Sequence, residues 1–406
     1  MKKNFILFLI LIAALMAVPG CFSSGPKTSD PEEAGMNKSV LRRLDHILDA
    51  AVVRKDFPGA VVLVGRKDKV VYRQAFGDSQ WVPSRKEMTA DMIFDLASLT
   101  KPIATATSVM ILVERGELSL DEKVKDYVPD FAVFKDEQGN AGEDARVWHL
   151  LTHTSGLPPY TDAALAAQAL GSPATTAALV TYIAHLPKTD PPGKAFHYSC
   201  LGYITLAHIV KHITGQTIAD FAAENIFNPL GMKDTFYTPP AKVVDRCVPT
   251  QVYDGHPLQG KVHDPLAALQ GGVSGNAGLF STADNLAIFA QMILNKGTYH
   301  EKRILGPLAV ERMTEVYAPA QFAGRGLGWD LDSAYATNRG DLFGPSSFGH
   351  TGYTGTSIWI DPETGTYVIF LTNRVHPDDK GSIIALRSRV ANVVAASIMS
   401  KTVTKK

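Results

Sequence analysis

A serine and a lysine stand three residues apart where an apolar segment begins, in the stretch Ala97-Ser98-Leu99-Thr100-Lys101. Side chains at i and i+3 share one face of a helix, so these two can meet. A serine hydroxyl is a poor nucleophile unless a neighbouring base takes its proton. Burial would lower the pKa of Lys101 and so prepare it as that base. Pro102 is tolerated only in the first turn, which places Ser98 at the mouth of the helix. The competing interpretation is an N-cap serine beside an exposed lysine.

Two more polar motifs stand where secondary structure is expected to begin. Tyr198-Ser199-Cys200 precedes a helix expected near Gly202, and His350-Thr351-Gly352 lies where a strand should start. With Ser98-x-x-Lys101, and in this order, they resemble the three signature motifs of the serine β-lactamase and penicillin-binding-protein superfamily. The closest likeness is to its class C, esterase and DD-peptidase branch. Two further segments, 150–157 and 271–283, are similar to that branch and to its penicillin-binding protein 4B-like members.

The resemblance implies a role for each residue of the first two motifs. Ser98 would be the acylated nucleophile, and Lys101 would accept or relay its proton. Tyr198 would be the second base and acid, passing that proton to the leaving group. No metal and no cofactor would take part.

The resemblance also implies a substrate cleft along the third motif. His350, Thr351 and Gly352 would line it, and the backbone N–H groups of Ser98 and Tyr353 would form the oxyanion hole. Losing one such donor typically costs on the order of 10²–10³ in rate.

The chain departs from the family pattern at two positions. Cys200 stands where the second motif usually ends in asparagine, and a thiol is too weak a donor and acceptor to replace the amide. Cys200 is therefore expected to weaken β-lactam or peptide hydrolysis and to favour esters or slow amide chemistry; a nucleophilic role is the minor alternative. His350 replaces lysine, which removes a fixed positive charge and makes carboxylate recognition pH-sensitive.

The composition excludes some classes of partner. The 406 residues contain 40 Lys and Arg against 40 Asp and Glu, and no basic stripe marks a nucleic-acid site. We therefore expect a small-molecule or peptidoglycan-derived substrate, no nucleic acid, and a monomer.

The N-terminus carries an export signal in its composition. Lys2 and Lys3 precede an apolar run over 5–18 that is too short to span a bilayer comfortably. The run ends in Val18-Pro19-Gly20-Cys21, which resembles the bacterial lipobox, although cleavage without lipidation is the alternative. The expectation is a signal peptide over 1–20, lipidated Cys21 with a polar tether over 21–34, and a catalytic domain over 35–400. The protein would then be a periplasm-facing lipoprotein of the cell envelope, on the outer membrane.

The hydrophobic patterns predict an α+β fold: an antiparallel sheet flanked by N- and C-terminal helices, with an all-helical lobe inserted over about 98–238. The glycine-rich segment 324–328 is expected to be a loop, and Gly326 to Trp329 is expected to begin a further sheet strand. The segments behind this prediction are helices over 40–53 and 382–399 and strands over 60–64, 70–72, 357–360 and 367–371.

Other candidate sites have simpler interpretations. His149 and His153 have the i,i+4 spacing of metal ligands, but no H-E-x-x-H motif accompanies them, so a structural pair is favoured. Cys200 and Cys247 allow one disulfide and no disulfide framework.

Taken together, the sequence predicts a membrane-tethered periplasmic serine hydrolase that works through a Ser98 acyl-enzyme. Its substrates would be esters or D-amino-acid peptides, as in a DD-carboxypeptidase or an esterase. The alternatives are a non-catalytic envelope protein that binds peptidoglycan or penicillin, and a class C-like β-lactamase.

Overall fold

The computed structural model describes residues 28–400 of the chain. The expected signal peptide and Cys21 lie outside these residues. Within the described residues, the helices are all too short or too polar to cross a bilayer.

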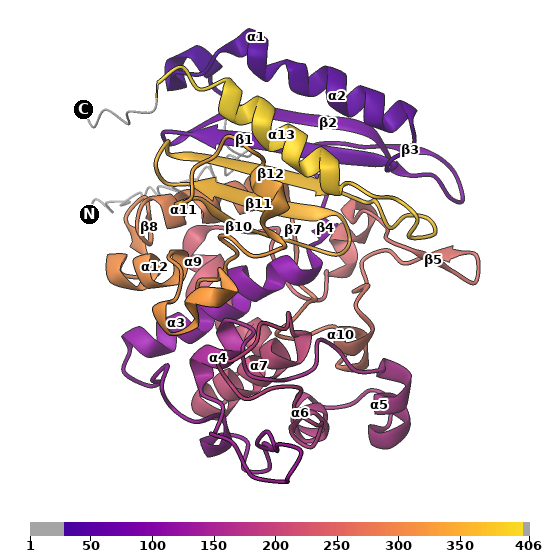
Figure 1. Cartoon of the computed structure of the whole chain (residues 1–406). Helices are drawn as coiled ribbons and strands as arrows, with labels where there is room; N and C mark the ends of the chain where they lie inside the picture. The colour runs from indigo at the N-terminus through magenta and orange to yellow at the C-terminus, as the bar shows by residue number, and fades with distance from the viewer. Residues whose placement is uncertain (1–27, 401–406) are drawn as a thin grey trace, which may run out of the picture.

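One antiparallel sheet of six strands forms the centre of the upper layer, as Figure 1 shows. Strand β1 is hydrogen-bonded to β2 on one side and to β12 on the other, so Ala60 lies opposite Thr372. The two ends of the chain therefore build one sheet, which confirms the predicted α+β class. The strands, in spatial order, are β10 (Phe348–Thr351), β11 (Thr356–Asp361), β12 (Thr366–Thr372), β1 (Gly59–Arg66), β2 (Lys69–Gln80) and β3 (Lys86–Glu87).

Both faces of this sheet are covered, which explains why β1 is apolar almost throughout. Successive side chains of a strand point to opposite faces. Val62 and Val64 accordingly pack into one hydrophobic cluster, and Val61 and Leu63 into another. The first cluster is closed by helices α1 (Lys38–Leu41), α2 (Arg43–Val53) and α13 (Ile384–Ala396), drawn above the sheet in Figure 1.

The second cluster joins the sheet to a helical lobe, drawn below it in Figure 1. The Ala-rich segment 163–186 forms two helices, because Gly171 with φ +82° and Pro173 interrupt it. The elements of the lobe are η2 (Ala97–Leu99), η3 (Lys101–Ala106), α3 (Thr107–Glu114), η4 (Val124–Asp126), α4 (Val147–Leu151), α5 (Ala163–Leu170), α6 (Thr176–Ala184), α7 (Cys200–Thr214), α8 (Ile218–Ala222), η5 (Ala223–Phe227) and α9 (Asn228–Leu230).

The rest of the chain returns from the lobe to the sheet. The strand expected to begin at Gly326 does not form, since this segment is a loop tied by an isolated bridge between Arg325 and Asp330. The elements of this part are η6 (Ala241–Arg246), α10 (Pro265–Leu269), α11 (Ala283–Leu294), α12 (Pro307–Thr314), η7 (Ala318–Ala323), η8 (Ala336–Arg339) and the short strands β4 (Phe94–Asp95), β5 (Val252–Tyr253), β6 (His256–Pro257), β7 (Phe280–Ser281), β8 (Thr298–Tyr299) and β9 (Lys302–Arg303).

Candidate active site

Ser98 is presented by a tight turn with an unusual backbone. Ala97 has φ +46°, which is uncommon for a residue with a Cβ. The buried Asp95 carboxylate holds this turn, because one oxygen accepts the Ala97 N–H at 2.9 Å and the other accepts the His263 N–H at 2.7 Å. Burial raises the pKa of Asp95 to about 6, with the two N–H groups acting against that rise. The turn thus holds Ser98 partly exposed while its neighbours are buried.

Lys101 is fully buried directly behind Ser98. Its Nζ lies 2.9 Å from the Ser98 Oγ, 3.0 Å from the Asn276 carbonyl oxygen and 3.4 Å from the Cys200 Sγ. Three acceptors match the three N–H donors of an ammonium group.

The expected lowering of the Lys101 pKa is wrong. Burial acts to lower it, as expected, but the interactions with Cys200 and Tyr198 outweigh burial and the pKa is raised. Lys101 is therefore charged in the resting site, and the proton of Ser98 has to be shared with a second group.

Tyr198 is placed to be that second group. Its ring centre lies 5.1 Å from the Lys101 Nζ, and its side chain interacts with that of Ser98, which acts to lower the Tyr198 pKa. Burial raises the pKa of Tyr198, while the charge of Lys101 acts to lower it. Ser98, Lys101 and Tyr198 therefore form one coupled proton network, and the fold brings them together as the motifs predicted.

The network opens into a cavity of about 420 Å³, which lies beside β10 at the edge of the sheet. The backbone N–H groups of Ser98 and Tyr353 donate no hydrogen bond to any residue among 28–400, as an oxyanion hole requires. The lining residues are Ser98, Tyr198, Arg325, Asp330, Tyr335, His350, Thr351, Gly352, Tyr353, Arg374, Gly381, Ser382, Ile383, Ile384 and Arg387.

The third motif is bound to the nucleophile turn through threonines. The Thr354 hydroxyl donates to the Asp95 carbonyl at 2.7 Å, and the Thr356 hydroxyl donates to the Leu96 carbonyl at 2.9 Å. The turn that carries Tyr353 and the turn that carries Ser98 are thus held in a fixed relation.

The sequence of the chain decides its family. A profile of the β-lactamase family matches residues 44–391. The chain belongs to the β-lactamase family. It is 30% identical over 401 residues to an Escherichia coli (strain K12) protein provisionally named a D-alanyl-D-alanine carboxypeptidase, with 92% of this chain and 91% of that protein covered. It is 32% identical over 417 residues to the Bacillus subtilis (strain 168) N-acetylmuramyl-L-alanine amidase, with the same coverage.

Solved structures of this β-lactamase family fold agree with the architecture. EstCE1, a hydrolase with promiscuous acyltransferase activity, matches with a TM-score of 0.72 at 21% identity over 88% of this chain and 99% of that one. A penicillin-binding protein homologue from Pyrococcus abyssi matches at 0.66 and 24% identity, over 86% and 76% of the two chains. The fold is that of the β-lactamases and transpeptidases, and the chain is a serine hydrolase of the β-lactamase family.

His350 differs from the expectation for this β-lactamase-family site. It is buried, its Nδ1 lies 2.8 Å from the Thr351 carbonyl oxygen, and burial together with the charges of Arg325 and Lys101 holds its pKa well below 6.5. His350 is therefore neutral across the neutral pH range, so the expected pH-sensitive recognition of a carboxylate does not arise from it.

Three arginines on the cavity wall lie outside the sequence motifs: Arg325, Arg374 and Arg387. Arg325 comes from the loop 324–328, and Arg387 comes from α13, where it donates to the carbonyls of Gly352 and Thr356. Burial lowers the pKa of Arg387 to about 9, so it is still charged at neutral pH. The sequence signal for Arg325 was a single charged residue among the three glycines of 324–328. Packing requires one of these glycines, because a Cβ on Gly326 would lie 2.2 Å from the Met313 carbonyl oxygen.

His149 and His153 each accept a backbone hydrogen bond. The Nδ1 of His149 accepts from the Arg146 N–H, and that of His153 accepts from the Ser199 N–H, both at 2.9 Å. Over the described residues, no three His, Cys, Asp or Glu side chains group as metal ligands would. Cys200 and Cys247 are both free thiols.

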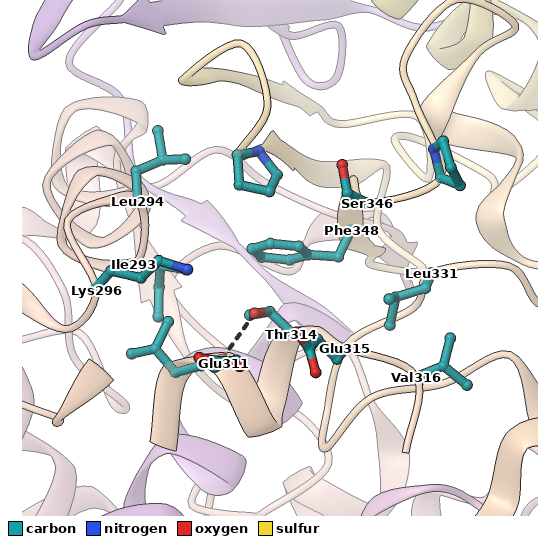
Figure 2. Close-up of a pocket in the computed structure, with 13 residues that line it drawn as sticks. Ile293, Leu294, Lys296, Glu311, Thr314, Glu315, Val316, Leu331, Ser346 and Phe348 are labelled. Atoms are coloured by element: carbon teal, nitrogen blue, oxygen red, sulfur yellow. Dashed lines mark hydrogen bonds between the residues drawn. The ribbon is translucent and has the colours of Figure 1, made fainter. Parts of the chain in front are cut away.

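A second cavity of about 260 Å³ lies away from this site, between α11, α12 and the start of β10 (Figure 2). Its wall is largely apolar, with Lys296, Glu311 and Glu315 at its rim. The Thr314 hydroxyl donates a hydrogen bond to the Val310 carbonyl at 2.8 Å. The lining offers no nucleophile with a base beside it, so the chemistry belongs to the Ser98 cavity.

Proposed function

We propose that the protein hydrolyses amide bonds of peptidoglycan-derived peptides, D-amino-acid peptides among them, through an acyl-enzyme on Ser98. One observation carries this proposal. The Ser98 hydroxyl lies 2.9 Å from the Lys101 Nζ and shares the wall of one cavity with Tyr198, where the backbone N–H groups of Ser98 and Tyr353 donate to no described residue.

The geometry supports the following steps. The Ser98 Oγ attacks the acyl carbon, and its proton passes to the Lys101–Tyr198 pair once that pair has lost a proton. The N–H groups of Ser98 and Tyr353 stabilise the oxyanion. Tyr198 then gives the proton to the leaving amine as the C–N bond breaks. Water attacks the Ser98 ester, loses a proton to the same pair, and releases the acid and the free Ser98 hydroxyl.

The substrate class rests on the names of two relatives. One is named a D-alanyl-D-alanine carboxypeptidase and the other an N-acetylmuramyl-L-alanine amidase, and both names refer to cleavage of an amide bond. Simple esters are the second candidate, because Cys200 replaces the asparagine of the family motif and touches Lys101 with a weakly hydrogen-bonding thiol.

Intact mass after exposure to a penicillin and to a panel of activated esters tests the proposal. Wild type is expected to gain one acyl group, and Ser98→Ala is expected to gain none while keeping its circular dichroism spectrum. Rapid drug consumption without a lasting adduct would indicate a β-lactamase instead. Binding of muropeptides by both proteins, with no adduct and no product from either, would establish the non-catalytic alternative.

We also propose that the protein is exported and anchored in the cell envelope through a lipid on Cys21. The support is the charged and apolar N-terminal sequence that ends in Val18-Pro19-Gly20-Cys21. Radiolabelled palmitate should enter wild type, and Cys21→Ser should be unlabelled and soluble in the periplasm. Labelling of both proteins would contradict the assignment.

A further inference from the structure

Arg325 is a buried charge with too few partners. Its side chain is 1% exposed, and within residues 28–400 its only ionic contact is between Nη1 and the Asp330 carboxylate at 3.4 Å. Its Nε and Nη2 have no hydrogen-bond partner among the described residues. Most buried polar groups are satisfied, and a buried charge without good partners is costly. A role in the site would explain why this cost is tolerated.

The position of Arg325 indicates what it acts on. Its guanidinium carbon lies 5.8 Å from the centre of the Tyr198 ring, on the wall of the Ser98 cavity. Its backbone is held as well, since its carbonyl accepts the Tyr317 N–H at 2.9 Å. The charge is therefore fixed in place close to Tyr198, in surroundings from which solvent is excluded.

Few other charges surround Tyr198. His153 and His350 lie 4.4 and 6.0 Å from its ring centre, and both are neutral because burial and the nearby cations hold their pKa values well below 6.5.

Cys200 and Tyr203 are further titratable neighbours of the pair. Burial raises the pKa of the Cys200 thiol and that of the Tyr203 hydroxyl, while the charge of Lys101 acts to lower that of Cys200. The ring of Tyr335 lies 5.1 Å from that of Tyr198 and is tilted by 39° against it. The fixed charges that act on Tyr198 are therefore Lys101 and Arg325, and Asp330 contacts Arg325 with the opposite sign. Asp264 acts on the Lys101 member of the pair.

We propose that Arg325 is a positioning residue that stabilises the deprotonated Tyr198–Lys101 pair through its fixed positive charge, and that Asp330 sets the strength of this effect. The inference rests on the proposed acyl-enzyme function. It assigns to Arg325 the fixed cation that the third motif lacks, because His350 stands there and is neutral. The sign follows from electrostatics: a nearby cation favours loss of a proton, and a nearby anion opposes it.

The test is the pH dependence of Ser98 acylation by a neutral activated ester, such as p-nitrophenyl acetate. In wild type the rate should rise with pH as the pair loses its proton. Arg325→Gln should move this rise to higher pH by about one to two pH units and slow acylation at neutral pH by about 10–100-fold, as expected for a charge near 6 Å in a partly shielded site. Arg325→Lys should keep most of the wild-type profile.

Asp330→Asn is the decisive variant, because its pH profile should shift in the opposite direction. Removing the counter-charge should move the rise to lower pH, which general damage to the fold does not do. Arg303→Gln, at an exposed arginine remote from the cavity, is the matched control and should follow wild type.

Three results would overturn the inference. One is slower acylation in Arg325→Gln and Asp330→Asn with an unmoved pH profile, which would indicate a structural role. A second is an increased KM confined to carboxylate-bearing esters with an unmoved profile, which would make Arg325 a substrate contact. The third is a wild type that Ser98-directed esters never acylate, which would remove the proposed function too. If wild type is acylated but the pH profiles of the variants do not move, this inference is refuted and the proposed function stands.

Discussion

Lys101→Met is expected to slow acylation of Ser98 at neutral pH by about 10²–10⁴-fold, the range typical of a lost general acid–base group. The ammonium group contacts the Ser98 Oγ and lies beside Tyr198, so its loss removes both the proton relay and the charge that lowers the pKa of Tyr198. The fold should persist, because methionine fills a similar volume without the cost of burying a charge. Stopped-flow measurement of the acylation rate and a thermal melt check the two parts of this expectation.

A second, half-buried lysine provides the control. Partial burial lowers the pKa of Lys188 to about 8, but its Nζ donates to the carbonyls of Ala184 and Leu186, away from the cavity. Lys188→Met should acylate at the wild-type rate. If Lys101→Met also acylates within tenfold of wild type, Lys101 has no part in the proton transfer.

Gly352→Ala should distort the oxyanion hole by displacing the turns that carry its N–H donors. A Cβ at this position would lie 2.3 Å from the Leu96 carbonyl oxygen and 2.2 Å from the Thr356 Oγ1. Relief of these contacts has to move the Ser98 turn away from the turn that carries Tyr353. Acylation should fall by about 10²–10³-fold, as when one oxyanion donor is lost, and the free energy of unfolding by about 1–3 kcal/mol.

The measurement is the acylation rate at saturating ester, with unfolding by urea in parallel. Gly142→Ala is the matched control, because its added Cβ would meet nothing closer than 3.5 Å. A Gly352→Ala protein that loses stability but acylates at the wild-type rate would separate this glycine from the oxyanion hole.

The architecture could be predicted where it depends on the hydrophobic pattern and on the spacing of residues that are close together in the chain. The apolar run over 60–64 is a strand because helices cover both faces of the sheet, and the turn after it reverses the chain. The S-x-x-K pair meets because one turn of helix separates its members. These features depend on residues close together in the chain.

The electrostatics of the site could not be obtained in that way. The pKa of Lys101 rises because Cys200 and Tyr198, about a hundred residues away, lie against it, and a residue type does not reveal such neighbours. Gly326 to Trp329 alternates like a strand but remains a loop, since Gly326 is pressed against the Met313 carbonyl. The charge of Arg325 acts on Tyr198 only through this loop's path across the fold.

The pairing of β1 with β12 also determines the order in which the molecule can assemble. Ala60 finds its partner at Thr372, near the far end of the chain, so the central strand lacks one neighbour until synthesis is almost complete. Contacts between such distant residues slow folding, because a long loop has to close first. A chain released before β11 would contain Ser98, Lys101, Tyr198 and His350, yet it would lack the Thr356 contact that helps to hold the nucleophile turn. Activity should therefore appear only in full-length chains, and late in refolding.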